Sequence, residues 1–137
     1  MTTPNPDAPS ETNGRRILLL DDEIAILTPM ARYFHRLGFL VDMASEAEEA
    51  EALIAHRQYD VAILDLRLTK YSDVSGLDVL REIRRRNENT RVVILSAYAS
   101  QAAEEEAIRL GADAVLRKPQ PLPDLAQFAL AHIGGVA

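Results

Sequence analysis

The chain has 137 residues, a usual size for one domain, and its 47% hydrophobic content is enough for one core. Its 15 Lys and Arg residues against 21 Asp and Glu residues give a net charge of −6, which argues against binding to nucleic acid or to an anionic membrane. We therefore expect proteins or small ions as partners. The sequence has no cysteine, as is common in a reducing compartment, so we expect a cytoplasmic protein. It shows neither the pattern of a signal peptide nor that of a membrane span.

The first part of the chain, residues 1–14, is rich in Pro, Thr, Asn and Ser and has no apolar periodicity. Such a segment buries too little apolar surface to offset the entropy of ordering, so we predict a disordered leader. From residue 15 onward, short apolar runs alternate with amphipathic stretches, and we predict one domain over residues 15–134. The runs, each predicted to be a strand, lie at residues 17–20, 39–41, 61–64, 92–95 and 114–116.

The stretch between the first two runs has apolar residues three to four positions apart, which predicts a helix with one buried face. These residues are Ile24, Leu27, Ala31, Phe34 and Leu37. Because Pro29 has no main-chain N–H, we expect this helix to begin near Ala25 or Ile26, which would place the proline among first-turn positions that need no N–H partner. Gly38 and Gly111 are predicted to end helices, since glycine readily adopts the left-handed conformation of a helix C-terminus.

The alternation of strands and helices predicts an α/β fold with a doubly wound parallel sheet, because right-handed crossovers place helices on both faces. Three of the runs are apolar throughout, as in strands that are covered on both faces. The second run turns polar at Asp42, which favours an edge position. Three consecutive arginines, Arg84 to Arg86, come near the end of the third predicted helix, and we interpret them as cations that complement the helix dipole.

Polar residues follow four of the predicted strands. They are Asp21, Asp22 and Glu23 after the first strand, Asp65 after the third, Ser96 after the fourth and Lys118 after the fifth. The carboxyl ends of parallel strands meet at one edge of a doubly wound sheet, and ligands bind there. Taken singly, each residue has an ordinary explanation: an acid caps the next helix, a serine lies in a turn, and a lysine is solvated.

Together these side chains predict a magnesium site beside a nucleophile. Carboxylates crowded at one edge repel one another unless a cation compensates them, and Mg²⁺ is commonly held by one or two carboxylates and phosphate oxygens. Asp65 would then be a carboxylate nucleophile that forms an aspartyl phosphate. Lys118 and Ser96 would surround the transferred oxygens, because phosphoryl transfer depends on positioning and charge neutralisation.

Five strings indicate a family resemblance: ILLLDDE, YDVAILDLRL, SGLDVL, VVILSA and GADAVLRKP, in this order. The chain resembles the receiver domain of bacterial two-component response regulators, in a single-domain form. The resemblance implies a flavodoxin-like five-stranded sheet with strand order 2-1-3-4-5. It also implies a phosphorylation-dependent switch rather than an enzyme, with a sensor histidine kinase or a histidine phosphotransfer protein as phosphoryl donor. Output would be through contact with another protein.

The resemblance also implies roles around the phosphoryl group. Asp65 matches the phospho-acceptor, Ser96 the switch hydroxyl that bonds the phosphoryl group, and Lys118 the lysine that pairs with it. The bond between Lys118 and Pro119 is cis in many members of this family.

A second set of roles concerns Mg²⁺. By resemblance, Asp22 and Asp65 match acids at the metal, Asp22 binding it directly, and Asp21 matches the neighbour that usually acts through water. The main-chain carbonyl of Arg67 matches the third protein ligand.

The sequence departs from the family pattern in three places. Val115 stands where the family usually has Tyr or Phe, so the ring movement that reports the state of the switch hydroxyl is missing. The segment 69–74 makes the connection longer than the family norm, either as a functional loop or as a tolerated surface insertion. Residues 120–123, Gln-Pro-Leu-Pro, change the start of the last helix.

Two other functions are weighed against the switch. A phosphatase of the haloacid dehalogenase type also uses an Asp nucleophile and Mg²⁺, but it needs a second Asp two residues later, where this chain has Arg67 after Asp65. A receiver-like interaction module that works independently of phosphorylation is favoured by Val115, whereas the intact acids argue for chemistry.

Overall fold

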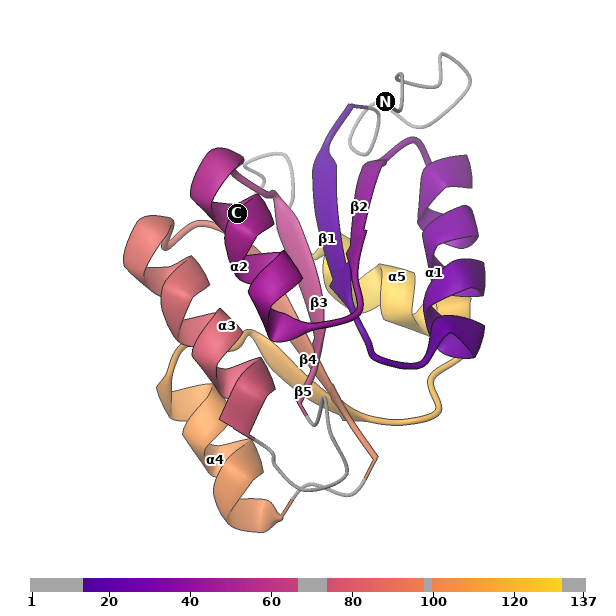
Figure 1. Cartoon of the computed structure of the whole chain (residues 1–137). Helices are drawn as coiled ribbons and strands as arrows, with labels where there is room; N and C mark the ends of the chain where they lie inside the picture. Colours follow the sequence, from indigo (N-terminus) through magenta and orange to yellow (C-terminus); the bar gives the residue numbers. More distant parts are fainter. Residues whose placement is uncertain (1–13, 67–73, 98–99, 132–137) are drawn as a thin grey trace.

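The computed structural model describes residues 14–66, 74–97 and 100–131. A parallel sheet lies between two layers of helices (Figure 1). The strands are β1 (Arg16–Leu20), β2 (Leu40–Ala44), β3 (Val61–Asp65), β4 (Arg91–Ser96) and β5 (Ala114–Arg117). The helices are α1 (Ile24–Arg36), α2 (Ala47–His56), α3 (Val74–Arg86), α4 (Gln101–Arg109) and α5 (Leu122–Leu130). None of the helices in the described ranges is long and apolar enough to cross a membrane.

The strands lie in the order β2-β1-β3-β4-β5, and every neighbouring pair is parallel, which confirms the predicted flavodoxin-like topology. β2 is at one edge, as its polar Asp42 predicted. The Asp42 carboxylate accepts hydrogen bonds from Arg57 Nη1 (2.9 Å) and from the Tyr59 hydroxyl (2.7 Å), so the edge strand is tied to the segment before β3. The strand order reverses between β1 and β3, and ligands of such sheets bind at this point.

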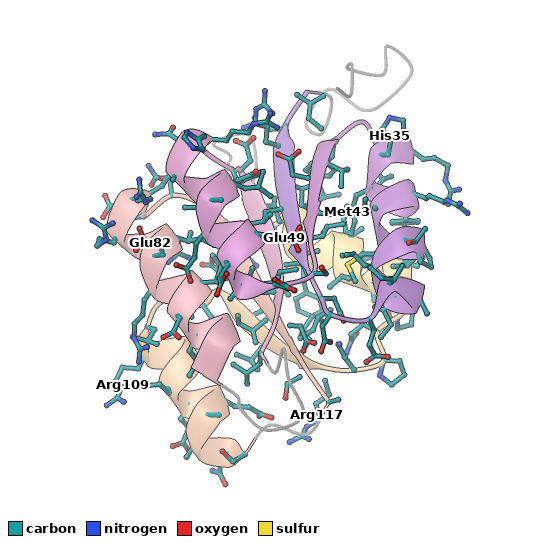
Figure 2. The ribbon with its side chains drawn as sticks, viewed as in Figure 1. His35, Met43, Glu49, Glu82, Arg109 and Arg117 are labelled. Carbon is teal, nitrogen blue, oxygen red and sulfur yellow. The ribbon has the colours of Figure 1, made fainter. Side chains whose placement is uncertain are left out.

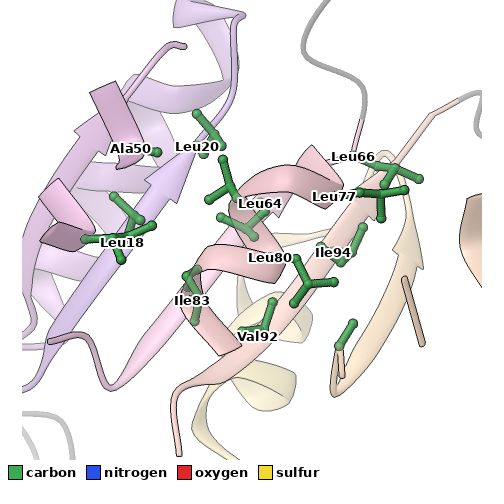
Figure 3. Packing of buried hydrophobic residues seen from close by; sticks show 14 of the residues in the cluster. Leu18, Leu20, Ala50, Leu64, Leu66, Leu77, Leu80, Ile83, Val92 and Ile94 are labelled. Carbon is green, nitrogen blue, oxygen red and sulfur yellow. The ribbon is translucent and has the colours of Figure 1, made fainter. Parts of the chain in front are cut away.

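Two apolar cores hold the layers together, because successive residues of a strand point to opposite faces of the sheet. Leu18 and Leu20 of β1 belong to the core under α2, α3 and α4 (Figure 3), and Ile17 and Leu19 belong to the core under α1 and α5. Fully burying such a side chain stabilises the fold by about 1.5–3 kcal/mol. The sheet is thus a rigid support for the polar residues at its carboxyl edge.

Helix α1 begins earlier than predicted and contains Pro29 in its interior. Glu23 precedes the helix in an extended conformation, and its carbonyl accepts hydrogen bonds from the N–H groups of Ile26 (3.0 Å) and Leu27 (2.9 Å). At Pro29 the helix therefore lacks the N–H that would otherwise bond to Ala25. The expected start near Ala25 or Ile26 was wrong. The buried face of the helix packs into the core, and this packing outweighs the one missing hydrogen bond.

Glycine ends two helices, as predicted. Gly38 and Gly111 have φ values of 103° and 105°, a region that favours glycine. Their N–H groups donate to the carbonyls of His35 (2.9 Å) and Ile108 (3.0 Å), which satisfies acceptors in the last turns of α1 and α4.

Arg84 has a different role from the one the sequence suggested. Its guanidinium donates to the main-chain carbonyls of Gly111 (2.7 and 2.9 Å) and Thr90 (2.6 Å) and pairs with Asp113 (3.0 Å). It therefore joins the end of α3 to the segments that lead into β4 and β5. The two following arginines instead pair with Glu82. Figure 2 shows Glu82 on the outer side of α3.

Candidate functional site

The structure brings the predicted strand-end residues together at the carboxyl edge of the sheet. Asp21 directly follows β1, Asp65 and Ser96 are the last residues of β3 and β4, and Lys118 directly follows β5. Asp65 is paired in register with residue 95 of β4, and Ser96 with residue 117 of β5. Asp21, Asp65 and Ser96 are buried, with 1%, 4% and 0% of their surface exposed, whereas Asp22 is exposed.

Asp21 is held by hydrogen bonds of its main chain and of both carboxylate oxygens. Its N–H donates to the carbonyl of Ala44 (3.2 Å), its Oδ1 accepts from the N–H of Glu23 (2.9 Å), and its Oδ2 accepts from Lys118 Nζ (2.7 Å). The contribution of Glu23 was missed from the sequence. It comes from the main-chain amide two residues after Asp21, and the tendency of aspartate to accept a hydrogen bond from that amide is the sequence signal that could have revealed it.

Lys118 connects two carboxylates that are far apart in the sequence. Its Nζ lies 2.7 Å from Asp21 Oδ2 and 3.2 Å from Asp65 Oδ2, and only 12% of its side chain is exposed. Burial lowers the pKa of Lys118, but the hydrogen bond to Asp21 and the charge of Asp65 outweigh burial, so the pKa is raised above its ordinary value. The ammonium therefore stays charged at neutral pH.

Lys118 is fixed by its main chain as well. Its N–H donates to the carbonyl of Ser96 (2.9 Å), and its bond to Pro119 is cis, as the resemblance implied. The main-chain hydrogen bond places Lys118 beside Ser96 at the ends of β5 and β4.

The acidic cluster has the donor set of a divalent-cation site. One carboxylate oxygen each of Asp21, Asp22 and Asp65 lie within 4.8 Å of one another. Among the described residues, Lys118 supplies one positive charge against these three negative charges. A residual charge of about −2 and hard oxygen donors fit Mg²⁺ or a similar ion. The Asp22 carboxylate makes no hydrogen bond within the described part of the chain, which leaves it available as a direct ligand.

Other predicted features lie outside the described residues or take an ordinary structural role. Arg67 and most of the 69–74 segment are not described. Val115 is partly buried and packs against the core under α4. Pro121 precedes α5 and Pro123 lies in its first turn, where a helix tolerates proline, and Gln120 Nε2 donates to the carbonyl of Arg117 (2.9 Å).

Comparison with known proteins gives related regulatory proteins. RegA, the photosynthetic apparatus regulatory protein of Rhodobacter capsulatus, is 34% identical over 119 residues, which cover 87% of this chain and 63% of RegA. The acid tolerance regulatory protein ActR of Rhizobium meliloti (strain 1021) is 38% identical over 111 residues, which cover 81% of this chain and 56% of ActR. The chain thus spans less than two thirds of these relatives.

Solved structures and a family model agree with these matches. A response regulator from Burkholderia pseudomallei, whose structure has a phosphorylated aspartic acid, a calcium ion and citrate, matches with a TM-score of 0.77 and 26% identity over 86% of this chain and 68% of its own. The family model of the response regulator receiver domain matches residues 17–129. This chain belongs to the response regulator receiver domain family.

Proposed function

We propose that this domain is a phosphorylation-dependent switch that takes a phosphoryl group onto Asp65. The observation that supports this most strongly is the contact of the Lys118 ammonium with a buried Asp65 carboxylate, next to Asp21. The structure of the similar response regulator from Burkholderia pseudomallei has a phosphorylated aspartic acid, which supports this proposal. As phosphoryl donor we propose a phosphohistidine on a sensor histidine kinase or a phosphotransfer protein.

In the proposed reaction a carboxylate oxygen of Asp65 attacks phosphorus. The new P–O bond forms as the P–N bond to the donor histidine breaks, and the imidazole leaves with the electron pair of that bond. Lys118 holds the carboxylate in place before the reaction and offers its charge to the phosphoryl oxygens afterwards. The buried Ser96 hydroxyl, at the end of the neighbouring strand, would donate a hydrogen bond to the same group.

We assign the divalent cation to Asp22, Asp21, Asp65 and the main-chain carbonyl of Arg67. The charge balance and the oxygen donors of the three aspartates support this assignment. A bound Mg²⁺ supplies positive charge that offsets the charge of the phosphoryl oxygens. Asp22 is the best candidate for direct coordination because it is exposed and makes no hydrogen bond to described residues, whereas both oxygens of Asp21 already accept hydrogen bonds.

A second candidate function is that of an interaction module whose contacts do not depend on phosphate. The observation in its favour is Val115, a small side chain where the family usually has an aromatic ring. In either case the output would be contact with a protein, and a cytoplasmic location stays a prediction. A haloacid dehalogenase type of phosphatase has less support, since the chain lacks the second aspartate that this chemistry requires.

Phosphorylation by a small donor separates these functions. We would incubate the protein with acetyl phosphate, with and without Mg²⁺, and measure its intact mass. The switch predicts a gain of one phosphoryl group that requires Mg²⁺ and is lost in Asp65→Asn. Asp78→Asn, an exposed aspartate on the outer surface of α3, is the matched control and should be labelled normally. Labelling of Asp65→Asn at the native rate would refute the proposal.

A further inference from the structure

One glycine lies in close contact with the main chain of the proposed acceptor. Gly76 is buried in the first turn of α3. A Cβ atom added to it would lie 2.4 Å from the carbonyl oxygen of Asp65, 2.7 Å from that of Leu66 and 2.8 Å from Leu66 Cα. Real Cβ atoms essentially never approach other atoms within 3.0 Å, so the contact as it stands is possible for glycine alone.

The atoms on both sides of this contact are held firmly. The N–H of Leu66 donates to the carbonyl of Leu95 (2.9 Å), and both Asp65 and Leu66 are buried. On the helix side, Leu77 and Leu80 belong to the same core as Leu66 (Figure 3). All three of the nearest atoms are main-chain atoms, so no flexible side chain could move aside for a larger residue.

We propose that Gly76 is a positioning residue for the phosphoryl-transfer site, and this inference rests on the function proposed above. Its missing side chain allows the first turn of α3 to lie on the main chain of Asp65 and Leu66. That contact sets where the Asp65 carboxylate lies relative to Asp21 and Lys118.

The size of the effect follows from the contact distance. Ordinary contact of a Cβ atom begins near 3.4 Å, so an alanine at residue 76 requires a displacement of about 1 Å from the 2.4 Å position. A displacement of about 1 Å in a catalytic group lowers rates by up to about 100-fold. Loss of support behind metal ligands weakens metal binding by about 10- to 100-fold. We therefore expect Gly76→Ala to bind Mg²⁺ at least about tenfold more weakly and to be phosphorylated correspondingly more slowly.

The experiment compares Gly76→Ala with native protein and with Gly111→Ala. Gly111 is a matched control because its added Cβ would also collide, 2.9 Å from Arg84 Nε, in a segment that is not part of the proposed site. Mg²⁺ binding is measured by isothermal titration calorimetry, and the rate of phosphorylation by acetyl phosphate is measured at saturating Mg²⁺. Circular dichroism establishes the folded fraction, and trimethylamine N-oxide is added to all samples if one variant is partly unfolded.

Weaker Mg²⁺ binding and slower phosphorylation in Gly76→Ala alone would support the inference. Native Mg²⁺ affinity in folded Gly76→Ala would overturn it, and so would an equal loss in Gly111→Ala, because general loosening would then explain both. Failure of Gly76→Ala to fold even in the osmolyte would overturn it too, since residue 76 would then determine folding itself. If the native protein takes up no phosphoryl group, the proposed function fails instead, and the native control shows this directly.

Discussion

Replacing Lys118 with methionine tests the electrostatic account of the site. The substitution keeps an unbranched apolar side chain but removes the ammonium that lies 2.7 Å from Asp21 and 3.2 Å from Asp65. The lysine side chain is only 12% exposed and both carboxylates are buried, so solvent screens this contact weakly. Removing one partner of a buried ion pair costs about 3–5 kcal/mol. Without metal we expect a loss of about 3 kcal/mol in the free energy of unfolding, which corresponds to a fall of about 10 °C in Tm.

Mg²⁺ should affect this variant in the opposite direction. The native ammonium repels a divalent cation, and its removal leaves three carboxylates uncompensated at the site. We expect Lys118→Met to bind Mg²⁺ about tenfold more tightly than the native protein. At the same saturating Mg²⁺ concentration, this tenfold tighter binding raises the free energy of unfolding of Lys118→Met by about 1.4 kcal/mol more than that of the native protein.

Urea unfolding followed by circular dichroism, in EDTA and in excess Mg²⁺, measures both effects. Arg36→Met is a suitable control because it removes an exposed cation at the end of α1, and its stability should stay within about 0.5 kcal/mol of the native value. If Lys118→Met were as stable as the control in EDTA, or bound Mg²⁺ more weakly than the native protein, the proposed charge balance would be incorrect.

Three further predictions concern the metal, the edge strand β2 and the contacts of Arg84. Asp22→Ala should remove most of the stabilisation by Mg²⁺, about 2.7 kcal/mol at a hundredfold excess over Kd, in thermal unfolding scans. Burial and the hydrogen bond to Asp42 raise the pKa of Tyr59 above 10.0, so its contribution to stability is complete below pH 10 and is lost as pH rises further. Tyr59→Phe should therefore reduce the fall in stability above pH 10 by up to about 1.4 kcal/mol per pH unit in urea titrations, and an unchanged slope would contradict this. Arg84→Ala should lower the free energy of unfolding by about 3 kcal/mol in urea unfolding, and Arg85→Ala should lower it by less than about 0.5 kcal/mol. Equal losses would contradict the role of Arg84 in joining α3 to the segments before β4 and β5.

Local patterns predicted much of the fold and the composition of the site. Apolar runs marked all five strands, and the runs of the three inner strands β1, β3 and β4 are apolar throughout because these strands are covered on both faces. The polar residues that follow them were predicted to meet, since parallel strands end at the same edge. Asp21, Asp65 and Lys118 do meet there. The start of α1 was predicted too late. The prediction considered only the hydrogen bond that Pro29 cannot make, whereas the packing of the whole buried face of the helix determines its position.

The sequence by itself determined the strand positions, the strand order implied by the family resemblance, and the kinds of side chain at the carboxyl edge. Only the tertiary structure decided that the guanidinium of Arg84 binds the main chain of two other segments, at Thr90 and Gly111. It alone also placed Gly76 against the main chain of Asp65. The physical reason is the same in both cases. Each contact involves main-chain atoms, which almost every residue possesses in identical form, so these partners leave no mark in the pattern of side chains.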